Sequence, residues 1–370
     1  MSVNPELPDS GRQDPSFAPA DSDREDASAS PSANNRRDAS LSRCGAVEGS
    51  PKIGVVLLNM GGPTSLADVE PFLLNLFADR EIIRLSPFSW LQKIIARRIV
   101  KKRAPKSRKA YSLIGGGSPL ARITAEQAQA LAGCLAGCGD FMVRCAMRYW
   151  HPLAAETLAE FAQAGVRQLL ALPLYPHYSR ATTGSSLNDL KRWAAGFNPA
   201  FTINEISAWP DQPEYLTALA DTITASAQKF TGEEFTVVYS AHSLPVSFIE
   251  DGDPYLDHIK RTITGVLKIT GRSGQLCFQS RSGPVRWLEP STPDILRQLA
   301  ARGVKNVLMV PISFVSDHVE TLYEIDIEYH DLAQTLGIRL VRSPALNTHP
   351  QLIAALARLV LQATGTTKRR

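Results

Sequence analysis

Short apolar runs rich in β-branched residues alternate with helix-length segments along this chain, and that alternation restricts its fold more than any other feature. Four such runs fall in the first half of the chain and four in the second. The candidate strands are residues 53–60, 141–147, 168–174, 202–206, 235–241, 274–280, 306–314 and 338–343. Nearly continuous apolar strands separated by helices are typical of parallel sheets covered on both faces, so the pattern predicts an α/β fold.

The two halves of the chain also resemble each other. Residues 165–174 read GVRQLLALPL and residues 303–312 read GVKNVLMVPI, and each run follows a predicted acidic helix, at 156–164 and 294–302. The matching Gly-Val, basic residue, amide and proline favour two copies of one unit over a chance likeness. We therefore predict two similar Rossmann-like domains, each with a doubly wound, parallel four-stranded sheet, that face each other across a cleft. Their expected bounds are 52–205 and 206–365.

The first 51 residues differ from the rest in composition. Residues 1–50 hold nine acidic and five basic side chains, so the remainder is basic, with 35 Lys and Arg against 27 Asp and Glu. Because this segment has few large apolar groups, we expect residues 1–51 to form a disordered acidic tail. It lacks the apolar region of a secretory signal and is too acidic for a transit peptide. No nucleic-acid partner is expected, since no basic cluster interleaved with aromatic residues forms a known module.

The cysteines indicate a reducing compartment. There are five, Cys44, Cys134, Cys138, Cys145 and Cys277, and their odd number and irregular spacing do not suit a disulfide framework. We therefore expect a cytoplasmic protein. Cys134, Cys138 and Cys145 are an alternative set of ligands for a metal cluster, but a fourth ligand would be distant, which favours structural thiols.

Polar side chains follow several predicted strands, at the edge where doubly wound sheets bind ligands. Arg148-Tyr149-Trp150-His151 follows the second strand, and His242-Ser243 follows the fifth. Asp317-His318-Val319-Glu320 follows the seventh. The glycine patterns of dinucleotide sites, of Walker A loops and of serine-hydrolase elbows are absent from the sequence, which makes those function classes unlikely candidates.

Three glutamates, Glu320, Glu324 and Glu328, recur at intervals of four residues. On a helix they would share one face and repel each other by about a few tenths of a kcal/mol per pair. A solvated acidic stripe is the simpler interpretation, but the residues around the ladder are apolar, which favours a row that lines an interior path for cations. Carboxylates combined with the imidazole of His242 suit a divalent first-row metal such as Fe²⁺.

A basic amphipathic segment spans residues 85–103. It combines Phe88, Trp90 and Ile94 with five Arg and Lys residues between 97 and 103. The pattern is typical of a peripheral contact with a membrane surface or of the rim of a site for an apolar acidic ligand. An ordinary surface helix packed on its sheet explains it equally well.

Several of these segments together identify a family resemblance. They are LLNMGGP (57–63), IGGGSPL (114–120), RYWHP (148–152), LPLYPHYS and TTGSSL (172–187), SAHSLP (240–245) and PISFVSDHVETLYEIDIEY (311–329). From about Ile53 to about Ile338 the chain resembles ferrochelatases, which are lyases of haem and porphyrin biosynthesis with two Rossmann-like domains and no dinucleotide. The resemblance implies insertion of Fe²⁺ into protoporphyrin IX, with release of two protons, to form protohaem in the last step of haem biosynthesis.

The resemblance also implies roles for individual residues. His242 would be the catalytic histidine at the porphyrin centre, with Glu320 opposite. The implied metal-side residues are His242, Glu320, Glu324, Glu328, Asp317 and His318. The implied substrate-side residues are Met60, Arg148, Tyr149, Trp287 and Phe314 around the macrocycle, Arg103, Lys106, Tyr111 and Ser118 at the propionates, and Leu73, Leu76 and Phe77, with residues 85–95, in an apolar lip.

The resemblance implies no tightly bound cofactor, because Fe²⁺ is a substrate. Some family members bind an iron–sulfur cluster through a Cys-rich C-terminal tail; here the last cysteine is Cys277, so that cluster is not expected. One alternative is a coproporphyrin III ferrochelatase, a branch that often has Tyr where Met60 stands. Others are a non-enzymatic tetrapyrrole- or metal-binding protein on the same fold, and a sirohydrochlorin-type cobalt chelatase, which would be shorter and lack the lip.

Overall fold

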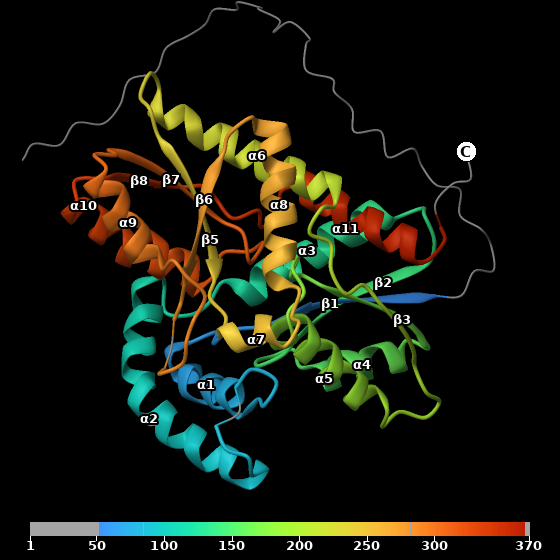
Figure 1. Cartoon of the computed structure of the whole chain (residues 1–370). Coiled ribbons are helices and arrows are strands. Elements are labelled where there is room, and N and C mark those ends of the chain that lie inside the picture. Colours follow the sequence, from blue (N-terminus) through green and yellow to red (C-terminus); the bar gives the residue numbers. More distant parts are fainter. Residues whose placement is uncertain (1–51, 84, 282, 367–370) are drawn as a thin grey trace, which may run out of the picture. The chain divides into compact units, whose positions relative to one another are not determined.

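All strands of the described residues run parallel and form two separate sheets (Figure 1). The computed structural model describes residues 52–83, 85–281 and 283–366, so the predicted tail at 1–51 lies outside the described residues. Sheet A contains β1 (Ile53–Asn59), β2 (Phe141–Met147), β3 (Gln168–Pro173) and β4 (Thr202–Glu205). Sheet B contains β5 (Thr236–His242), β6 (Gly274–Gln279), β7 (Asn306–Pro311) and β8 (Arg339–Arg342). All eight predicted strands are confirmed, to within a few residues at their ends.

The strand order confirms the predicted duplication. Sheet A has the order β2-β1-β3-β4 and sheet B has the order β6-β5-β7-β8, so each sheet places its own second strand at one edge and its fourth at the other. The repeated sequence runs form β3 and β7, the third strand of each sheet. The fold is therefore α/β, with two Rossmann-like units of the same topology.

Helices connect the parallel strands in both halves. The first half contains η1 (Leu66–Asp68), α1 (Val69–Ala78), α2 (Ser89–Leu113), α3 (Leu120–Leu135), α4 (Ala154–Gln163), η2 (Arg180–Gly184) and α5 (Ser185–Ala194). The second half contains α6 (Pro213–Ala227), η3 (Gln228–Phe230), α7 (Val246–Glu250), α8 (Tyr255–Thr270), α9 (Thr292–Ala301), η4 (Glu320–Tyr329), α10 (His330–Thr335) and α11 (Pro350–Ala363). Both predicted acidic helices are present as α4 and α9.

The strands are buried on both faces, as their apolar sequences predict. In β1, Val55 and Leu57 join one hydrophobic cluster, whereas Val56 and Leu58 join another. Successive strand residues point to opposite faces, so a run without polar residues needs a helical layer on each side. Residues of α4 and α5 cover one face of sheet A, and residues of α9 and η4 cover one face of sheet B.

The inner faces of the two sheets share one hydrophobic core. It combines residues of β1 and β3 with residues of β5 and β7, and α3, α6 and α11 contribute to it. The C-terminal helix α11 packs against α3 as well as against α6, and Figure 1 shows it beside α3. The two units are therefore joined by a common apolar layer, in addition to having outer layers of their own.

Helices α1 and α2 form a separate apolar unit at one end of the molecule (Figure 1). Val69, Phe72, Leu73 and Val100 pack there with Tyr111 and Tyr149. The predicted amphipathic segment at 85–103 lies mostly in α2, whose first helical residue is Ser89. In the part of the chain that the structure describes, none of the helices combines the length and the apolarity needed to cross a membrane.

Candidate active site

The site begins where two neighbouring strands of sheet B end. β5 ends at His242 and β7 ends at Pro311, and because the strands are parallel and adjacent their carboxyl ends meet at one edge. There the imidazole Nδ1 of His242 lies 3.0 Å from Oε2 of Glu320. The other carboxylate oxygen of Glu320 lies 3.8 Å from Nε2 of His318. The structure thus brings His242, Glu320 and His318 together, although 78 residues separate His242 from Glu320 in sequence.

Phe314 is the aromatic wall of this cluster. Its ring meets that of His318 edge to face, with centroids 4.6 Å apart, and that of His242 with centroids 6.2 Å apart. A small cavity of about 10 Å³ lies among these side chains and is bordered also by Ser240, Gln279 and Thr321. Such a volume accepts about one water molecule or a metal ion, and not a macrocycle. His242 is the member of the cluster that reaches the surface, with 31% of its side chain exposed.

The His242–Glu320 pair is an ion pair in a largely buried setting. Burial alone raises the pKa of Glu320, but the neighbouring imidazole of His242 and its hydrogen bond outweigh burial and hold that pKa well below its usual range. Burial lowers the pKa of His242, but the charge and hydrogen bond of Glu320 overcome this and raise it above the ordinary value. The ion pair therefore keeps Glu320 ionised and favours a protonated His242.

The glutamate ladder runs from the interior to the surface. Glu320 is buried, Glu324 is half-buried and Glu328 is exposed. All three lie on η4, which is a π-helix where the sequence predicted a helix of unspecified type. Residues four apart stay on one face of a π-helix, as they do on an α-helix, because its turn contains slightly more than four residues. The predicted shared face is therefore retained, and it connects the His242 cluster to solvent.

Glu324 has donors of its own at the end of β6. Oε2 of Glu324 accepts hydrogen bonds from Oγ of Ser280 at 2.6 Å and from Nε2 of Gln279 at 3.3 Å. Burial and then the charge of Glu320 raise the pKa of Glu324 to about 7, although the Ser280 bond opposes the change. Between pH 4.5 and 7, Glu324 therefore keeps a proton that an exposed glutamate would have released.

Replacement of this carboxyl should change the pH dependence of stability. Because the pKa of Glu324 is raised in the folded state, unfolding releases its proton between about pH 4.5 and 7, and the free energy of unfolding falls as pH rises across that interval. As pH rises from about 4.5 to 7, we expect the free energy of unfolding of Glu324→Gln to increase by about 1–3 kcal/mol relative to that of the wild type. Urea unfolding at pH 4.5, 6 and 7.5 measures the difference. Glu328→Gln is the exposed control, and a difference that does not change with pH for Glu324→Gln would contradict the expectation.

Asp317 is placed differently from the other metal-side residues. Its carboxylate accepts from Thr321 Oγ1 at 2.9 Å and from Asn347 Nδ2 at 2.8 Å, and pairs with Arg342 at 3.0 Å. Gln127 of α3 in turn donates to the backbone carbonyl of Asn347 at 2.6 Å. The structure therefore shows Asp317 fixing the start of η4 and the segment before α11, and a role in metal binding stays a prediction.

The substrate-side residues of sheet A surround a buried carboxylate, Asp79. One oxygen of Asp79, at the C-terminal end of α1, accepts from Arg148 at 2.9 Å, from the Tyr149 hydroxyl at 2.7 Å and from the Ser185 hydroxyl. Tyr149 is 2% exposed, and burial raises its pKa well above the usual range, with a further contribution from the charge of Asp79. Arg148 and Tyr149 thus hold α1 against sheet A, and direct contact of either with a porphyrin stays a prediction.

The remaining predicted substrate-side residues are spread over the region around α1 and α2. Leu73 is buried, and Met60, Leu76 and Phe77 are half-buried, in the same apolar cluster. The Arg103 guanidinium lies over the Phe77 ring at 5.4 Å, whereas Lys106 is exposed. Tyr111 is buried in the same apolar cluster, and burial, with a further contribution from the charge of Glu320, raises the pKa of its hydroxyl.

Two further predicted residues lie in loops beside the strand ends. The backbone of Trp287 pairs with that of Pro245, three residues after His242. Ser118, after the triple glycine, donates its backbone N–H to Pro63 at 2.7 Å, and Gly116 donates to Tyr111 at 2.8 Å. These two N–H groups are therefore used inside the protein, and a contact of Ser118 with a propionate stays a prediction.

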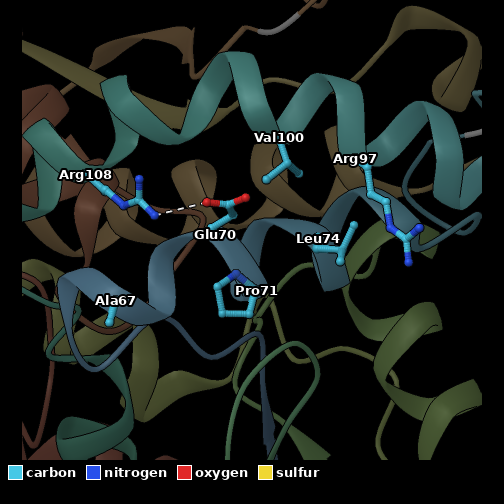
Figure 2. Close-up of a pocket in the computed structure, with 7 residues that line it drawn as sticks. All are labelled: Ala67, Glu70, Pro71, Leu74, Arg97, Val100 and Arg108. Atoms are coloured by element: carbon cyan, nitrogen blue, oxygen red, sulfur yellow. Dashed lines mark hydrogen bonds and ion pairs between the residues drawn. The ribbon is translucent and has the colours of Figure 1, made fainter.

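A second cavity lies elsewhere in the described residues. It measures about 360 Å³ and lies between α1 and α2, where Figure 2 shows Pro71, Leu74 and Val100 beside the ion pair of Glu70 with Arg108. None of the predicted site residues borders this cavity, so a choice of site by cavity volume would miss the cluster of His242 and Glu320. Among the described residues, no group of three or more His, Cys, Asp and Glu side chains is arranged to hold a metal ion. Cys134, Cys138 and Cys145 pack against the main core.

The sequence analysis missed four polar residues of the site: Gln279, Ser280, Ser313 and Tyr255. Gln279 and Ser280 lie inside the run predicted as strand 274–280, so the rule that ligands bind beyond strand ends passed over them, whereas β6 ends at Gln279. Ser313 lies in a run predicted as strand. No sequence signal marks Tyr255, which reaches the site from α8.

Comparisons with known proteins cover the whole described fold. The family model Ferrochelatase matches residues 52–364. A ferrochelatase of Desulfotalea psychrophila is 57% identical over 311 residues, which span 84% of this chain and 97% of that protein. A ferrochelatase of Geotalea uraniireducens is 52% identical over 312 residues, with 84% and 97% covered. Among solved structures, the sirohydrochlorin chelatase SirB of Bacillus subtilis subspecies spizizenii in complex with cobalt aligns with a TM-score of 0.48 at 14% identity, over 85% of this chain and 96% of that one.

Proposed function

Because this chain belongs to the ferrochelatase family, we propose that it inserts Fe²⁺ into protoporphyrin IX, with release of two protons, as the last step of haem biosynthesis. The observation that carries the proposal is the ion pair of His242 with Glu320 beside a cavity of ion size. A partly exposed imidazole next to a buried carboxylate supplies both a proton acceptor and an anionic partner for the incoming cation. Carboxylate oxygen and imidazole nitrogen are ligands that suit Fe²⁺.

His242 is the proposed proton acceptor. Insertion of a divalent cation into a porphyrin releases two pyrrole protons, so a base with a pKa near neutrality is needed. An approaching cation competes for the charge of Glu320 and thereby removes the interaction that raises the pKa of His242. The imidazole then releases its own proton and is ready to accept one from the macrocycle. The base is therefore made available by the arrival of the metal substrate.

Glu324 is the proposed next proton acceptor. With a pKa of about 7, it binds and releases a proton readily near neutral pH, and it lies on the same face of η4 as Glu320. The exposed Glu328 follows one turn further on. This order supports a route for protons leaving the site, and for cations entering it, along one helix.

The choice of protoporphyrin rests on Met60. Its thioether is apolar and half-buried in the cluster that contains Leu76 and Phe77, which suits a macrocycle with few carboxylates. Leu73, Leu76 and Phe77 are proposed to cover the edge of the macrocycle, and Arg103 is proposed to meet a propionate. A rigid apolar wall that bends the ring would expose its nitrogen lone pairs, which favours insertion.

Turnover with two porphyrins tests the proposal. The purified full-length protein is incubated under anaerobic conditions with Fe²⁺ or Zn²⁺ and either protoporphyrin IX or coproporphyrin III, and the absorbance change of metal insertion is followed. We expect a higher kcat/KM with protoporphyrin IX. A preference for coproporphyrin III would support the other branch of the family. Tight porphyrin binding without turnover of either would indicate a non-enzymatic binding protein.

We also propose that the protein is cytoplasmic and touches an anionic membrane surface through the beginning of α2. Phe88, Trp90 and Ile94 are 61%, 66% and 43% exposed, and Trp90 and Ile94 lie on one helical face. The helix continues with basic residues at 97, 98, 101 and 102 and contains no acidic ones. Exposed aromatic residues followed by clustered cations suit the interface of a bilayer with anionic lipids.

Vesicle binding tests this contact. We expect the wild type to sediment with vesicles that contain phosphatidylglycerol but not with vesicles of phosphatidylcholine alone. The double variant Trp90→Ser, Ile94→Ser should bind about tenfold more weakly, because it loses most of the exposed apolar area. Trp193→Ser, which removes another exposed tryptophan on α5, is the matched control. Equal binding of all three proteins would argue against this surface.

A further inference from the structure

We propose that Tyr255 is a positioning residue for His242, and that Asp253 ties this arrangement to the first half of the chain. The inference rests on the proposed role of His242 as the proton acceptor. Neither Tyr255 nor Asp253 lies at a strand end, and both reach the site from the start of α8. The Tyr255 hydroxyl nevertheless contacts the backbone of His242, and Asp253 contacts the backbone of Tyr255.

Tyr255, Ser313 and His242 form a closed ring of hydrogen bonds. The Tyr255 hydroxyl donates to the backbone carbonyl of His242 at 2.9 Å, and Ser313 Oγ accepts the backbone N–H of His242 at 2.8 Å. The two hydroxyls lie 2.7 Å apart. Because the tyrosine proton is used on the carbonyl, the serine hydroxyl donates to the tyrosine oxygen. Each group in such a ring both donates and accepts, which strengthens the individual bonds.

The ring replaces a missing strand partner. On the β7 side, the pairing of β5 ends at Ser240 with Pro311, two residues before His242. Without another partner, the N–H and C=O groups of His242 on that side would be buried and unpaired, at a considerable cost. Ser313 and Tyr255 supply the acceptor and the donor that the next strand residue would have provided. The direction of the His242 imidazole therefore depends on two side chains.

Asp253 connects the ring to the segment that follows β3. Oδ1 of Asp253 accepts the backbone N–H of Tyr255 at 3.1 Å. Oδ2 accepts from the Ser179 hydroxyl at 3.0 Å and from the N–H of Arg180 at 2.8 Å, at the beginning of η2. The buried ring of His177 also packs edge to face on the Tyr255 ring, with centroids 6.2 Å apart. Tyr255 is thus held by residues of the first half while it holds a catalytic residue of the second.

The consequence is a mechanical link between the two sheets at the reacting group. A small displacement of η2 relative to sheet B would be passed through Asp253 and Tyr255 to the carbonyl of His242. Misplacement of a reacting group by about 1 Å can cost about a hundredfold in rate. Tyr255 therefore acts on kcat through the position of His242, without touching the porphyrin.

Removal of the tyrosine hydroxyl tests the proposal. We expect Tyr255→Phe to lower kcat for metal insertion about tenfold, with a porphyrin KM within twofold of the wild type. Ser313→Ala should have a similar effect, and the double variant should lose little more than either single one, because the ring acts as a unit. Tyr215→Phe is the matched control: it removes another buried tyrosine hydroxyl that donates to a backbone carbonyl, that of Ile312. A kcat of Tyr255→Phe within twofold of the wild type would overturn the proposal.

A second measurement reads the position of His242 without any turnover. With histidine labelled in the ring, we expect one sharp set of His242 imidazole NMR signals in the wild type and in Tyr215→Phe, and broadened or doubled signals in Tyr255→Phe. If the wild type fails to turn over either porphyrin, the proposed function is wrong, but the NMR comparison still decides whether Tyr255 positions His242. Identical His242 signals in all three proteins would refute the positioning role.

Discussion

Replacement of His242 by alanine is expected to lower kcat for metal insertion by about 10²–10⁴-fold, the usual contribution of a general base. The imidazole is the partly exposed group of the cluster and the proposed base, and Glu320 would be left as a buried carboxylate without its main partner. Porphyrin affinity, measured by fluorescence quenching, should change little, because the apolar residues around Met60 and Phe77 lie in a different cluster. The loss should therefore appear in kcat rather than in KM.

A second histidine provides the control for this variant. His151 also follows a strand of the sheet and also pairs with a glutamate, Glu156, through its Nδ1 atom at 2.8 Å. That pair is exposed, at 60% and 46% of the side chains, so His151→Ala should keep wild-type activity. Unchanged turnover of His242→Ala would refute the assignment of the base, whatever the porphyrin used.

Loss of the Asp79 carboxylate is expected to have the largest effect on stability. Asp79 is 7% exposed and is bound by Arg148, Tyr149 and Ser185. Asp79→Ala would remove the shared acceptor of the Arg148 guanidinium and two buried hydroxyls, and would leave Arg148 with Asp189, at 3.6 Å, as its remaining carboxylate. Breaking a buried pair on one side costs about 3–5 kcal/mol. Urea unfolding of the variant should show a loss of that size in the free energy of unfolding.

An exposed ion pair in the same half of the chain provides the control for this loss of stability. Arg144 pairs with Glu160 at 2.8 Å, but the two side chains are 46% and 52% exposed. Glu160→Ala should therefore cost less than about 1 kcal/mol. If Asp79→Ala and Glu160→Ala destabilised the protein equally, the Asp79 cluster would not hold α1 in place as the structure indicates.

The sequence predicted the fold well because the strands are buried on both faces. A short, unbroken apolar run such as that of β7 is typical of a strand buried on both faces. The repeated Gly-Val run located the third strand of both sheets. The family resemblance, and not the periodicity, pointed to the pairing of His242 with Glu320. Spacing alone showed only that Glu320, Glu324 and Glu328 share a face.

Other features depend on tertiary contacts that leave no trace in local sequence. The type of η4 was not predictable, because a spacing of four residues suits an α-helix and a π-helix alike. Asp79 contacts Arg148 and Ser185 over 69 and 106 residues of sequence, and nothing near Asp79 distinguishes it from an ordinary helix-end carboxylate. Tyr255 was missed for the same reason, since its partners lie on β5 and after β7.

The identical strand order of the two sheets allows residues of one half to be matched with residues of the other. In sheet A, Gly54 pairs with Leu169; in sheet B, Thr236 pairs with Val307, which corresponds to Leu169 in the sequence repeat. Six residues further along, Met60 therefore corresponds to His242. The same correspondence matches Thr182, on the π-helix η2, with Glu320 on the π-helix η4.

The two halves thus share one topology but carry different side chains at matched positions. At these two matched positions, one copy carries a thioether and a hydroxyl where the other carries an imidazole and a carboxylate. A flat and nearly symmetric guest held between the copies would meet an inert side and a reactive side. A guest bound in this way would therefore have one face for chemistry, although the strand order around it repeats.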